Sequence, residues 1–521
     1  MLKRLPSDQL LRLIVGVSLL VLGAGAVIVS TAYDDPPTAS ALKGDAPVNA
    51  GAGNPSDIRS HNSPTLARNP VRAANVVISN RIDTPQFACD LQVSFDGGGT
   101  WTQTPIPLPK GEEPKCFAPD AAFAPDGTLY LSFATLKGRG NVPNAVWTVR
   151  STDGGRTLSE PVKAGGGLRF QVRLAVDPVN PRRVYLTWVK AADVGFLKFT
   201  ETGNPIQSIR SDDGGATWRQ PVRVSSPARA RAVAPVPAVG PKGELYVLYL
   251  DVGEDRLDYE GGHQGKGGAP YQGDFRLVLA RSRDQGRTWA ESVVGDGIKP
   301  IHRFVVLFPP YPALAVDRRS GRIYAAFHDA RLGDPDVSVW SLPAGPKKKW
   351  QGPTRVNDTP SHDGTWQYLP QLAVAPNGRL DVLYYDRRSD RENIMNHVSL
   401  QSSFDSGKSF IPSTRLSSQP FDSRIGFGGK NGLPDLGSRL ALLPDRQRTL
   451  AVWSDTRAGT QATNKQDLSR AVVAFSDPPR LSKAVRYGLR YGGLALVLLG
   501  LGVLGWELFE SRKRTEHTVA W

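Results

Sequence analysis

Residues 94–101 read Ser-Phe-Asp-Gly-Gly-Gly-Thr-Trp, and this pattern returns four more times along the chain. The five copies are centred on the aspartates Asp96, Asp153, Asp213, Asp284 and Asp405. Intervals of 57, 60, 71 and 121 residues separate these aspartates, so the last interval is a doubled period with a decayed copy near residues 341–350. A period of about 60 residues indicates a repeat protein in which each unit is one supersecondary element.

Each residue type in the pattern has a role in a tight turn. The aspartate accepts hydrogen bonds from backbone amides, glycine adopts a positive φ, the hydroxyl residue holds the return strand, and the aromatic residue packs beneath. Around each copy the sequence shows an apolar strand, a turn such as residues 125–127, a second β-rich strand, a loop, a third strand that ends in the pattern, and a return strand. Four strands per repeat predict an all-β chain built from propeller blades.

The five copies resemble the Asp-box, or bacterial neuraminidase repeat, and residues 63–478 are similar to the sialidase-like propeller superfamily. The resemblance implies a single β-propeller of four-stranded blades. It does not choose an activity, because such propellers include sialidases, other glycosidases, receptors and binding proteins. A first copy near residues 69–108 and a last copy without the pattern near residues 438–475 favour seven blades. Six blades is the alternative, if the two partial copies share one blade.

Both ends of the chain carry apolar segments. Residues 13–32 contain no charge and follow three basic residues, whereas residues 492–508 contain only Glu507 and precede the basic run 512–514. Length and flanking charge predict N- and C-terminal transmembrane helices with both termini in the cytoplasm and the intervening domain outside the cell. A cleaved signal peptide is the alternative for the first segment, because residues 30–32 are small enough for a peptidase site.

These observations divide the chain into five parts. We expect a signal-anchor or transmembrane segment at residues 1–36, a flexible linker rich in small and polar residues at 37–62, the propeller at 63–478, a transmembrane helix at 485–509 and a cytoplasmic tail at 510–521. Cys89 and Cys116 are the two cysteines of the chain, and in an oxidising compartment we expect them to form a disulfide. Closing that loop contributes about 3 to 4 kcal/mol in the chain-entropy model.

The chain is basic, with a formal net charge of +15. The flanks of the two apolar segments hold nine basic residues and four acids, which leaves about +10 for the rest of the chain. A basic exported domain attracts acidic glycans, wall polymers or lipid headgroups, although a merely solvated basic surface has the same composition. No compact run of lysine and arginine with interleaved aromatic residues occurs, which argues against nucleic-acid binding.

The order of the strands predicts where function lies. In a four-stranded meander the repeated turn joins the third and fourth strands, so it shares a face with the turn between the first and second strands. The remaining loops lie on the other face and are long, at residues 137–145, 191–206, 251–275, 295–310, 357–369 and 417–437. Binding and catalytic residues concentrate on such loops, so we expect a ligand site on this long-loop face.

Three Asp-x-Arg segments follow the second strand of successive repeats, at residues 329–331, 386–388 and 455–457. Their arginines would occupy equivalent positions on adjacent blades, and a guanidinium cluster suits an anionic sugar. The ligand-binding candidates are Arg331, Arg388, Arg457 and Asp455. Ion pairs between neighbouring blades are the structural alternative for the same residues.

No catalytic role is carried over from the resemblance. The chain has no Arg-Ile-Pro segment of the kind that supplies the superfamily's first arginine, and no clear match to its tyrosine and glutamate pair. Asp329, Asp386 and Tyr385 are weak catalytic candidates, and Tyr249, Tyr384 and Tyr385 are more typical of packing residues on propeller strands.

No cofactor or metal is expected. The acidic segment Asp251, Glu254, Asp255, Asp258 and Glu260 lacks the spacing of a calcium loop, so calcium is only a weak alternative there. The histidines His263, His302, His328 and His362 are scattered without metal or triad spacing.

Two functions from different classes fit the sequence. The first is a membrane-anchored extracellular propeller that recognises a glycan, an anionic wall polymer or a protein through its long-loop face. The alternative is a sialidase-like exo-glycoside hydrolase in which the three arginines hold an anionic sugar while Asp329 or Asp386 transfers a proton.

Overall fold

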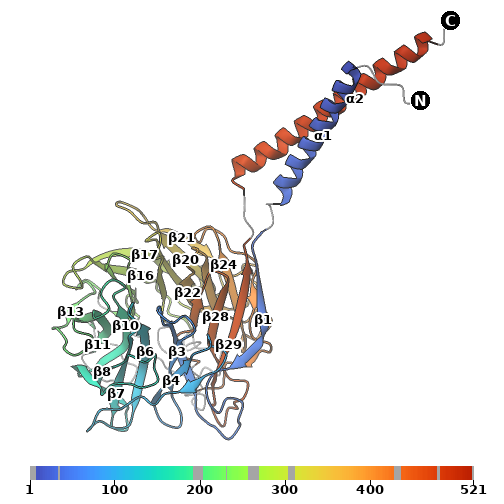
Figure 1. Ribbon diagram of the computed structural model, residues 1–521. Helices are drawn as coiled ribbons and strands as arrows, with labels where there is room; N and C mark the ends of the chain where they lie inside the picture. The colour runs from blue at the N-terminus through green and yellow to red at the C-terminus, as the bar shows by residue number, and fades with distance from the viewer. Residues whose placement is uncertain are drawn as a thin grey trace. The chain divides into compact units, whose positions relative to one another are not determined.

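The computed structural model describes residues 7–32, 36–191, 204–229, 231–255, 269–302, 311–426, 436–477 and 481–518. Seven sheets of four main strands follow one another around a common axis in this part of the chain (Figure 1). The first strands of neighbouring sheets contact one another all the way round, so they are the innermost strands. The protein is therefore a seven-bladed β-propeller, and the prediction of an all-β propeller with seven blades is confirmed.

The first four blades are antiparallel meanders in chain order. Their strands are β2 (His61–Arg68), β3 (Val76–Ile82), β4 (Ala88–Ser94) and β5 (Thr102–Gln103); β6 (Cys116–Phe123), β7 (Leu129–Lys137), β8 (Val142–Ser151) and β9 (Val162–Gly166); β10 (Arg169–Val176), β11 (Val184–Lys190), β12 (Ile206–Ser211) and β13 (Val222–Arg223); and β14 (Ala232–Val239), β15 (Leu245–Asp251), β16 (Phe275–Ser282) and β17 (Ala290–Ile298).

The remaining blades follow the same order until the last. The fifth contains β18 (Ala313–Val316), β19 (Ile323–Asp329), β20 (Asp336–Leu342) and β21 (Gln351–Arg355); the sixth contains β22 (Gln367–Val374), β23 (Leu380–Asp386), β24 (Met395–Ser403) and β25 (Thr414–Arg415), with β26 (Phe421–Asp422) paired to β24; and the seventh contains β27 (Ala441–Pro444), β28 (Arg448–Asp455), β29 (Asp467–Ser476) and β1 (Thr38–Pro47).

The seventh blade is completed by the N-terminal strand. β1 pairs with β29 and is the outermost strand of this sheet, so the ring closes through two distant parts of the chain. Just beyond β1, Asn49 donates to Asp467 over 3.0 Å and accepts from the amide of Leu468 over 2.7 Å. The expectation of a flexible linker over residues 37–62 is therefore wrong for residues 38–47. The small residues of this segment suggested a tether. Their backbone groups instead pair with the edge strand β29, which would otherwise be exposed.

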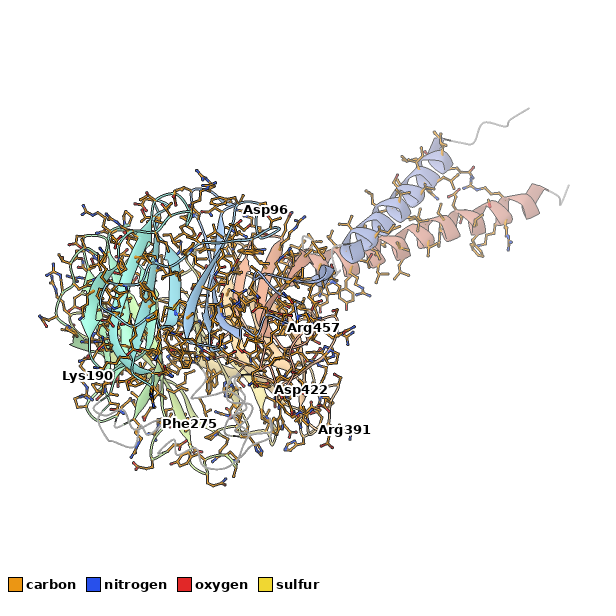
Figure 2. All side chains as sticks on the ribbon, turned by 90° about the horizontal axis from the view of Figure 1, so that it is seen from below. Asp96, Lys190, Phe275, Arg391, Asp422 and Arg457 are labelled. Atoms are coloured by element: carbon orange, nitrogen blue, oxygen red, sulfur yellow. A yellow bond between two sulfur atoms is a disulfide. The ribbon has the colours of Figure 1, made fainter. Side chains whose placement is uncertain are left out.

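The repeated pattern forms the same turn in every copy. In the first, Ser94 Oγ donates to Asp96 over 2.7 Å, the amide of Gly98 donates to Ser94 Oγ over 2.8 Å, and Thr100 Oγ1 donates to Asp96 over 2.8 Å. Equivalent bonds occur around Asp153, Asp213, Asp284 and Asp405. Each turn joins the third strand of a blade to the fourth. Asp96 lies at one end of the propeller, with Lys190, Phe275 and Arg391 toward the other (Figure 2).

Apolar side chains fill the space between blades. One continuous core contains Val189 of the third blade, Leu248 of the fourth and Phe327 of the fifth, all at most 1% exposed. A disulfide between Cys89 and Cys116 joins β4 to β6 and so links the first two blades covalently. Burial of both faces of each sheet provides the main stabilisation of the ring.

Two helices lie at the chain ends, α1 (Ser7–Ala32) and α2 (Lys483–Thr518). Both contain a stretch long and apolar enough to cross a membrane. They form a compact unit of their own, separate from the unit that contains the propeller.

The carboxylates of the repeated turns make the propeller sensitive to acid. Although partial burial acts to raise it, hydrogen bonds from Ser151 and Thr157 lower the pKa of Asp153 to about 2. A lowered folded-state pKa adds stability above the unfolded value of about 3.9, and this stability is lost as the pH falls through the folded value. We expect Asp153→Asn to destabilise the full chain by about 1 to 2 kcal/mol at pH 7 in urea unfolding. The difference from the wild type should shrink between pH 4 and pH 2. A difference that is constant across this range would contradict the assignment.

Candidate functional site

The three Asp-x-Arg arginines are each bound by the aspartate two residues before them. Arg331 pairs with Asp329, Arg388 Nε lies 2.6 Å from Asp386, and Arg457 Nε lies 2.8 Å from Asp455. Additional carboxylates reach two of them. Asp358 lies 2.7 Å from Arg388, and Asp45 of β1 pairs with Arg457. The guanidinium groups are thus already neutralised by the protein.

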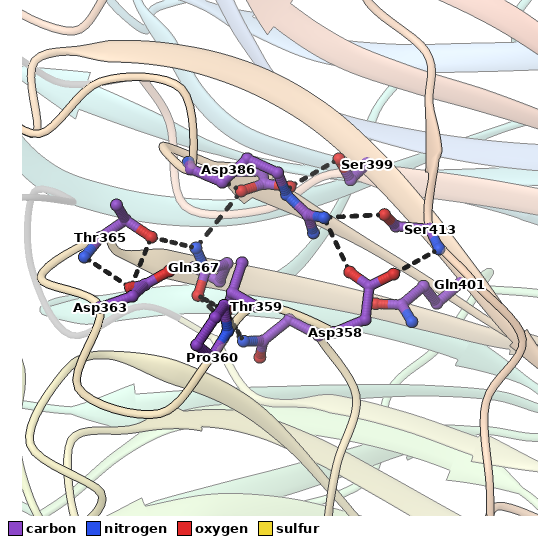
Figure 3. A network of polar contacts seen from close by, with 12 residues as sticks. Asp358, Thr359, Pro360, Asp363, Thr365, Gln367, Asp386, Ser399, Gln401 and Ser413 are labelled. Atoms are coloured by element: carbon purple, nitrogen blue, oxygen red, sulfur yellow. Dashed lines mark hydrogen bonds and ion pairs between the residues drawn. The ribbon is translucent and has the colours of Figure 1, made fainter.

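Asp386 is the centre of a buried polar network (Figure 3). It accepts hydrogen bonds from Ser399 over 2.7 Å and from Gln367 over 3.3 Å, and Asp358 also accepts from the amide of Ser413 over 2.9 Å. Burial works to lower the pKa of Arg388, but Asp386, Tyr384 and Asp358 outweigh it and raise that pKa. Asp358 lies in the segment that connects β21 of the fifth blade to β22 of the sixth, so its ion pair with Arg388 fixes this connection to the sixth blade.

The remaining catalytic candidates, Asp329 and Tyr385, are also enclosed, as are the tyrosines that we expected to be packing residues. Tyr249, Tyr384 and Tyr385 are fully buried, and the hydroxyl of Tyr385 donates to the carbonyl of Ser454 over 3.2 Å. Burial raises the pKa of Tyr385 well above 10 and also raises the pKa of Asp329. These side chains pack the blades and tie strand ends to loops.

The structure describes only part of the acidic segment, because Asp258, Glu260 and also His263 lie outside the described residues. Asp251 accepts from Arg229 over 2.7 Å. Within the described ranges, no group of three or more acidic, histidine or cysteine side chains is arranged to hold a metal ion.

A second repeat, on the innermost strands, builds a different site. In β2, β6, β10, β14 and β22 the pairing with the second strand shifts by a bulge at the same place. One residue of each bulge has a positive φ: Ser63, Ala118, Gln171, Ala234 and Leu369. Proline follows it in four of the five, and Tyr311-Pro312 stands at the same point before β18. A bulge re-aims the side chains that follow it, here next to the propeller axis.

Side chains after these bulges form a polar chain across four blades. Thr65 Oγ1 of β2 donates to Asp120 of β6 over 2.9 Å, and Arg173 Nε of β10 donates to the same carboxylate over 2.7 Å. Arg439, two residues before β27, donates to Thr65 Oγ1 over 3.2 Å and to the carbonyl of Pro119 over 2.7 Å. Residues from distant repeats therefore meet at the axis.

Two further residues complete this group. Tyr311 of the fifth blade lies with its ring centre 5.2 Å from the guanidinium carbon of Arg173. Arg81 of the first blade pairs with Asp83 and stacks over Phe117 at 4.8 Å. Asp120, Arg439 and Tyr311 are 2%, 6% and 6% exposed. We call Thr65, Arg81, Asp120, Arg173, Tyr311 and Arg439 the central arginine cluster.

Burial and neighbouring charges shift the pKa values of three side chains in the central arginine cluster. Burial raises the pKa of Asp120, but Arg173 and Arg439 outweigh it and hold that pKa below its usual value. Burial, followed by repulsion from Arg173, lowers the pKa of Arg439 to about 10. Burial raises the pKa of the Tyr311 phenol to about 12, while Arg173 and Arg439 act to lower it. Arg439 remains a cation at neutral pH, and its two hydrogen bonds go to neutral oxygens.

Sequence reasoning did not find this cluster, although a signal was present. Proline recurs near the start of the first strand at Pro64, Pro119, Pro235, Pro312 and Pro370. In the third and seventh blades the equivalent residues are Gln171-Val-Arg173 and Gly437-Ser-Arg439, without the proline. Arg173 and Arg439 therefore lie in the two blades that lack it. A comparison of repeats centred on the first strand, instead of on the repeated turn, would have exposed both.

Comparisons with known proteins identify neither a family nor an activity. No family model and no curated protein matches the chain. Solved structures that match include a protein of unknown function from Dyadobacter fermentans (13% identity, 84% of this chain and 99% of that chain, TM-score 0.46), a Hadza microbial sialidase (14%, 77% and 74%, 0.43) and a polysaccharide lyase described as an ulvan lyase (11%, 81% and 95%, 0.46). Such distant similarities assign no activity, so the site is interpreted from its own residues.

The two central arginines should differ in their contribution to stability. Arg173→Met leaves the buried Asp120 without its cation, so we expect a loss of about 3 to 5 kcal/mol in urea unfolding of the full chain. Arg439→Met removes two hydrogen bonds and an attraction to Asp120, but it also relieves repulsion from Arg173 and the cost of burying a guanidinium, so we expect a change within about 1 kcal/mol of the wild type. Equal losses in the two variants would mean that Arg439 is an ordinary structural cation.

Proposed function

We propose that this protein is a membrane-tethered propeller that binds a carboxylate-bearing glycan outside the cell at its central arginine cluster. The observation that carries the proposal is Arg439, a buried guanidinium held by neutral oxygens beside a second cation. A side chain with these surroundings is typical of a functional position.

Charge counting supports an anionic ligand. Among the residues that the structure describes, the contacts that join the cluster and its partners involve the three cations Arg81, Arg173 and Arg439 and the two carboxylates Asp83 and Asp120. A ligand carboxylate would restore neutrality, and the forked guanidinium binds a carboxylate through two parallel hydrogen bonds. The ring of Tyr311 supplies an apolar surface against which a sugar ring can pack.

The remainder of the chain supports an extracellular ligand. Two terminal helices suited to a membrane flank the propeller, and basic residues precede the first and follow the second. This arrangement fits a chain with cytoplasmic termini and an exported domain. The disulfide between Cys89 and Cys116 fits an oxidising compartment. The resemblance of the repeated turns to Asp-box repeats adds glycans to the ligands to test first.

Binding can be tested on the full chain in detergent micelles. We expect sialic acid or oligogalacturonate to bind, measured by calorimetry, and the carboxyl-reduced sugar to bind at least about tenfold more weakly, a loss of about 1.4 kcal/mol. Arg439→Met should weaken binding by the same order. The control is Asp329→Asn with Arg331→Met, which removes a neutralised pair that takes no part in ring closure and should leave the affinity unchanged. Binding that survives Arg439→Met but disappears in the control would move the site to the Asp-x-Arg arginines.

A sialidase-like hydrolase is the second candidate, favoured by the position of Tyr311 beside Arg173. In such a reaction a base would take the phenol proton, the phenol oxygen would bond to the anomeric carbon, and the glycosidic oxygen would leave with a proton from an acid. Arg173 and Arg439 act in favour of the phenolate, but burial outweighs them and raises the pKa of Tyr311 to about 12, so the reaction depends on that base.

Turnover of a fluorogenic sialoside separates the two candidates. For a hydrolase, Tyr311→Phe should lower kcat by at least about 10³ while ligand affinity stays within about threefold of the wild type. Binding without turnover by the wild-type chain would leave recognition as the function.

A further inference from the structure

The two terminal helices contact each other through glycines. A methyl group at Gly23 of α1 would lie 2.5 Å from the carbonyl oxygen of Gly493 in α2. A methyl group at Gly500 of α2 would lie 2.8 Å from the carbonyl oxygen of Gly16 in α1. No other residue fits at such distances, so the helix backbones approach closely at two levels. Small residues that allow such an approach are the common basis of helix packing in membranes.

The contacts define one specific face of each helix. Gly16 faces Gly500 and Gly23 faces Gly493, so the helices run antiparallel, with contacts seven residues apart on both. Gly25 and Gly492 lie close by in the sequence, yet a methyl group at either would have nothing within 4 Å. The close approach is therefore confined to the contact face and does not follow from glycine content alone.

An ion pair continues the same antiparallel alignment. Arg12 Nη1 of α1 lies 3.5 Å from Glu507 Oε2 of α2, and Glu507 is only 5% exposed. An ionised side chain within a membrane-spanning segment is costly unless it has a partner. Glu507 is the single charge in the second apolar stretch, and α1 supplies its cation. Loss of α1 would expose both the glycine face and this carboxylate.

From these contacts we propose that α1 stays in the mature protein as the permanent partner of α2, and is not removed as a signal peptide. The chain is then a two-helix membrane hairpin whose extracellular part is the propeller. This inference rests on the proposed membrane tethering. α2 covers Gly16 and Gly23 of α1, and α1 provides the cation that pairs with Glu507 of α2.

Cross-linking of the full chain in native membranes with a short bis-maleimide tests the pairing. The test variant is Arg12→Cys with Glu507→Cys, because the two side chains meet across the helices, with Arg12 Nη1 3.5 Å from Glu507 Oε2, and the contact glycines stay unchanged. The control is Leu11→Cys with Leu508→Cys, which changes the neighbouring positions, whose side chains are 62% and 66% exposed. The two native cysteines already form a disulfide, so they do not compete. A protease site in the turn at Gly138, outside the loop closed by that disulfide, reports cross-linking because joined fragments migrate together.

We expect the bis-maleimide to join the fragments of the test variant at least about tenfold faster than those of the control, because only the test positions face each other across the two helices. An N-terminal epitope tag should remain on the mature chain. Loss of the tag by cleavage near Ala32, equal rates in the two variants, or cross-links formed only between differently tagged copies would each overturn the proposal. Cross-linking in a chain that alkaline washing releases from membranes would instead refute the tethering and retain the helix pair.

Discussion

Closure of the ring is the constraint on which the rest of the structure depends. Every blade buries both faces against its neighbours, so no blade can be left incomplete without exposing apolar surface or an unpaired strand edge. The seventh blade obtains three strands from the C-terminal part of the propeller and its outermost strand, β1, from the N-terminal part. Asn49 and Asp45 secure that strand through Asp467 and Arg457. Closure therefore consists of ordinary hydrogen bonds and ion pairs formed over the longest sequence separations in the domain.

Because the ring closes, side chains from distant repeats meet at its axis. Arg439 and Thr65 are 374 residues apart in the sequence and share a hydrogen bond. A bulge on five of the seven innermost strands makes this geometry repeatable, and the residues that follow it differ from blade to blade. Where most blades have proline followed by a small or neutral residue, the third and seventh have arginines. The scaffold is regular, and the central arginine cluster arises where the repeat departs from its own pattern.

The sequence was sufficient for the architecture because the repeated turn is local. Ser94, Asp96 and Thr100 form their bonds within seven residues, so spacing alone reveals the turn, and periodicity then gives the blades. The Asp-x-Arg segments are equally local. Because the aspartate lies only two residues before the arginine, each arginine pairs with the aspartate of its own segment. The central arginine cluster is the opposite case, since its contacts depend on which strands lie innermost and on bulges that shift the pairing. The strand β1 was missed for a related reason: its composition is that of a linker, and only the unpaired edge of β29 makes it a strand.

The closing blade also carries both connections from the propeller to the terminal helices. β1 begins six residues after α1 ends, and β29 ends seven residues before α2 begins. The strands that complete the ring are thus the same strands that lead to the helix pair, and they are neighbours in one sheet. In a tethered chain, tension on the two connections would act on one pair of strands and not across the ring. The innermost strands around Arg173 and Arg439 belong to a different layer of the blades, so within the propeller the proposed binding site does not share strands with the two connections.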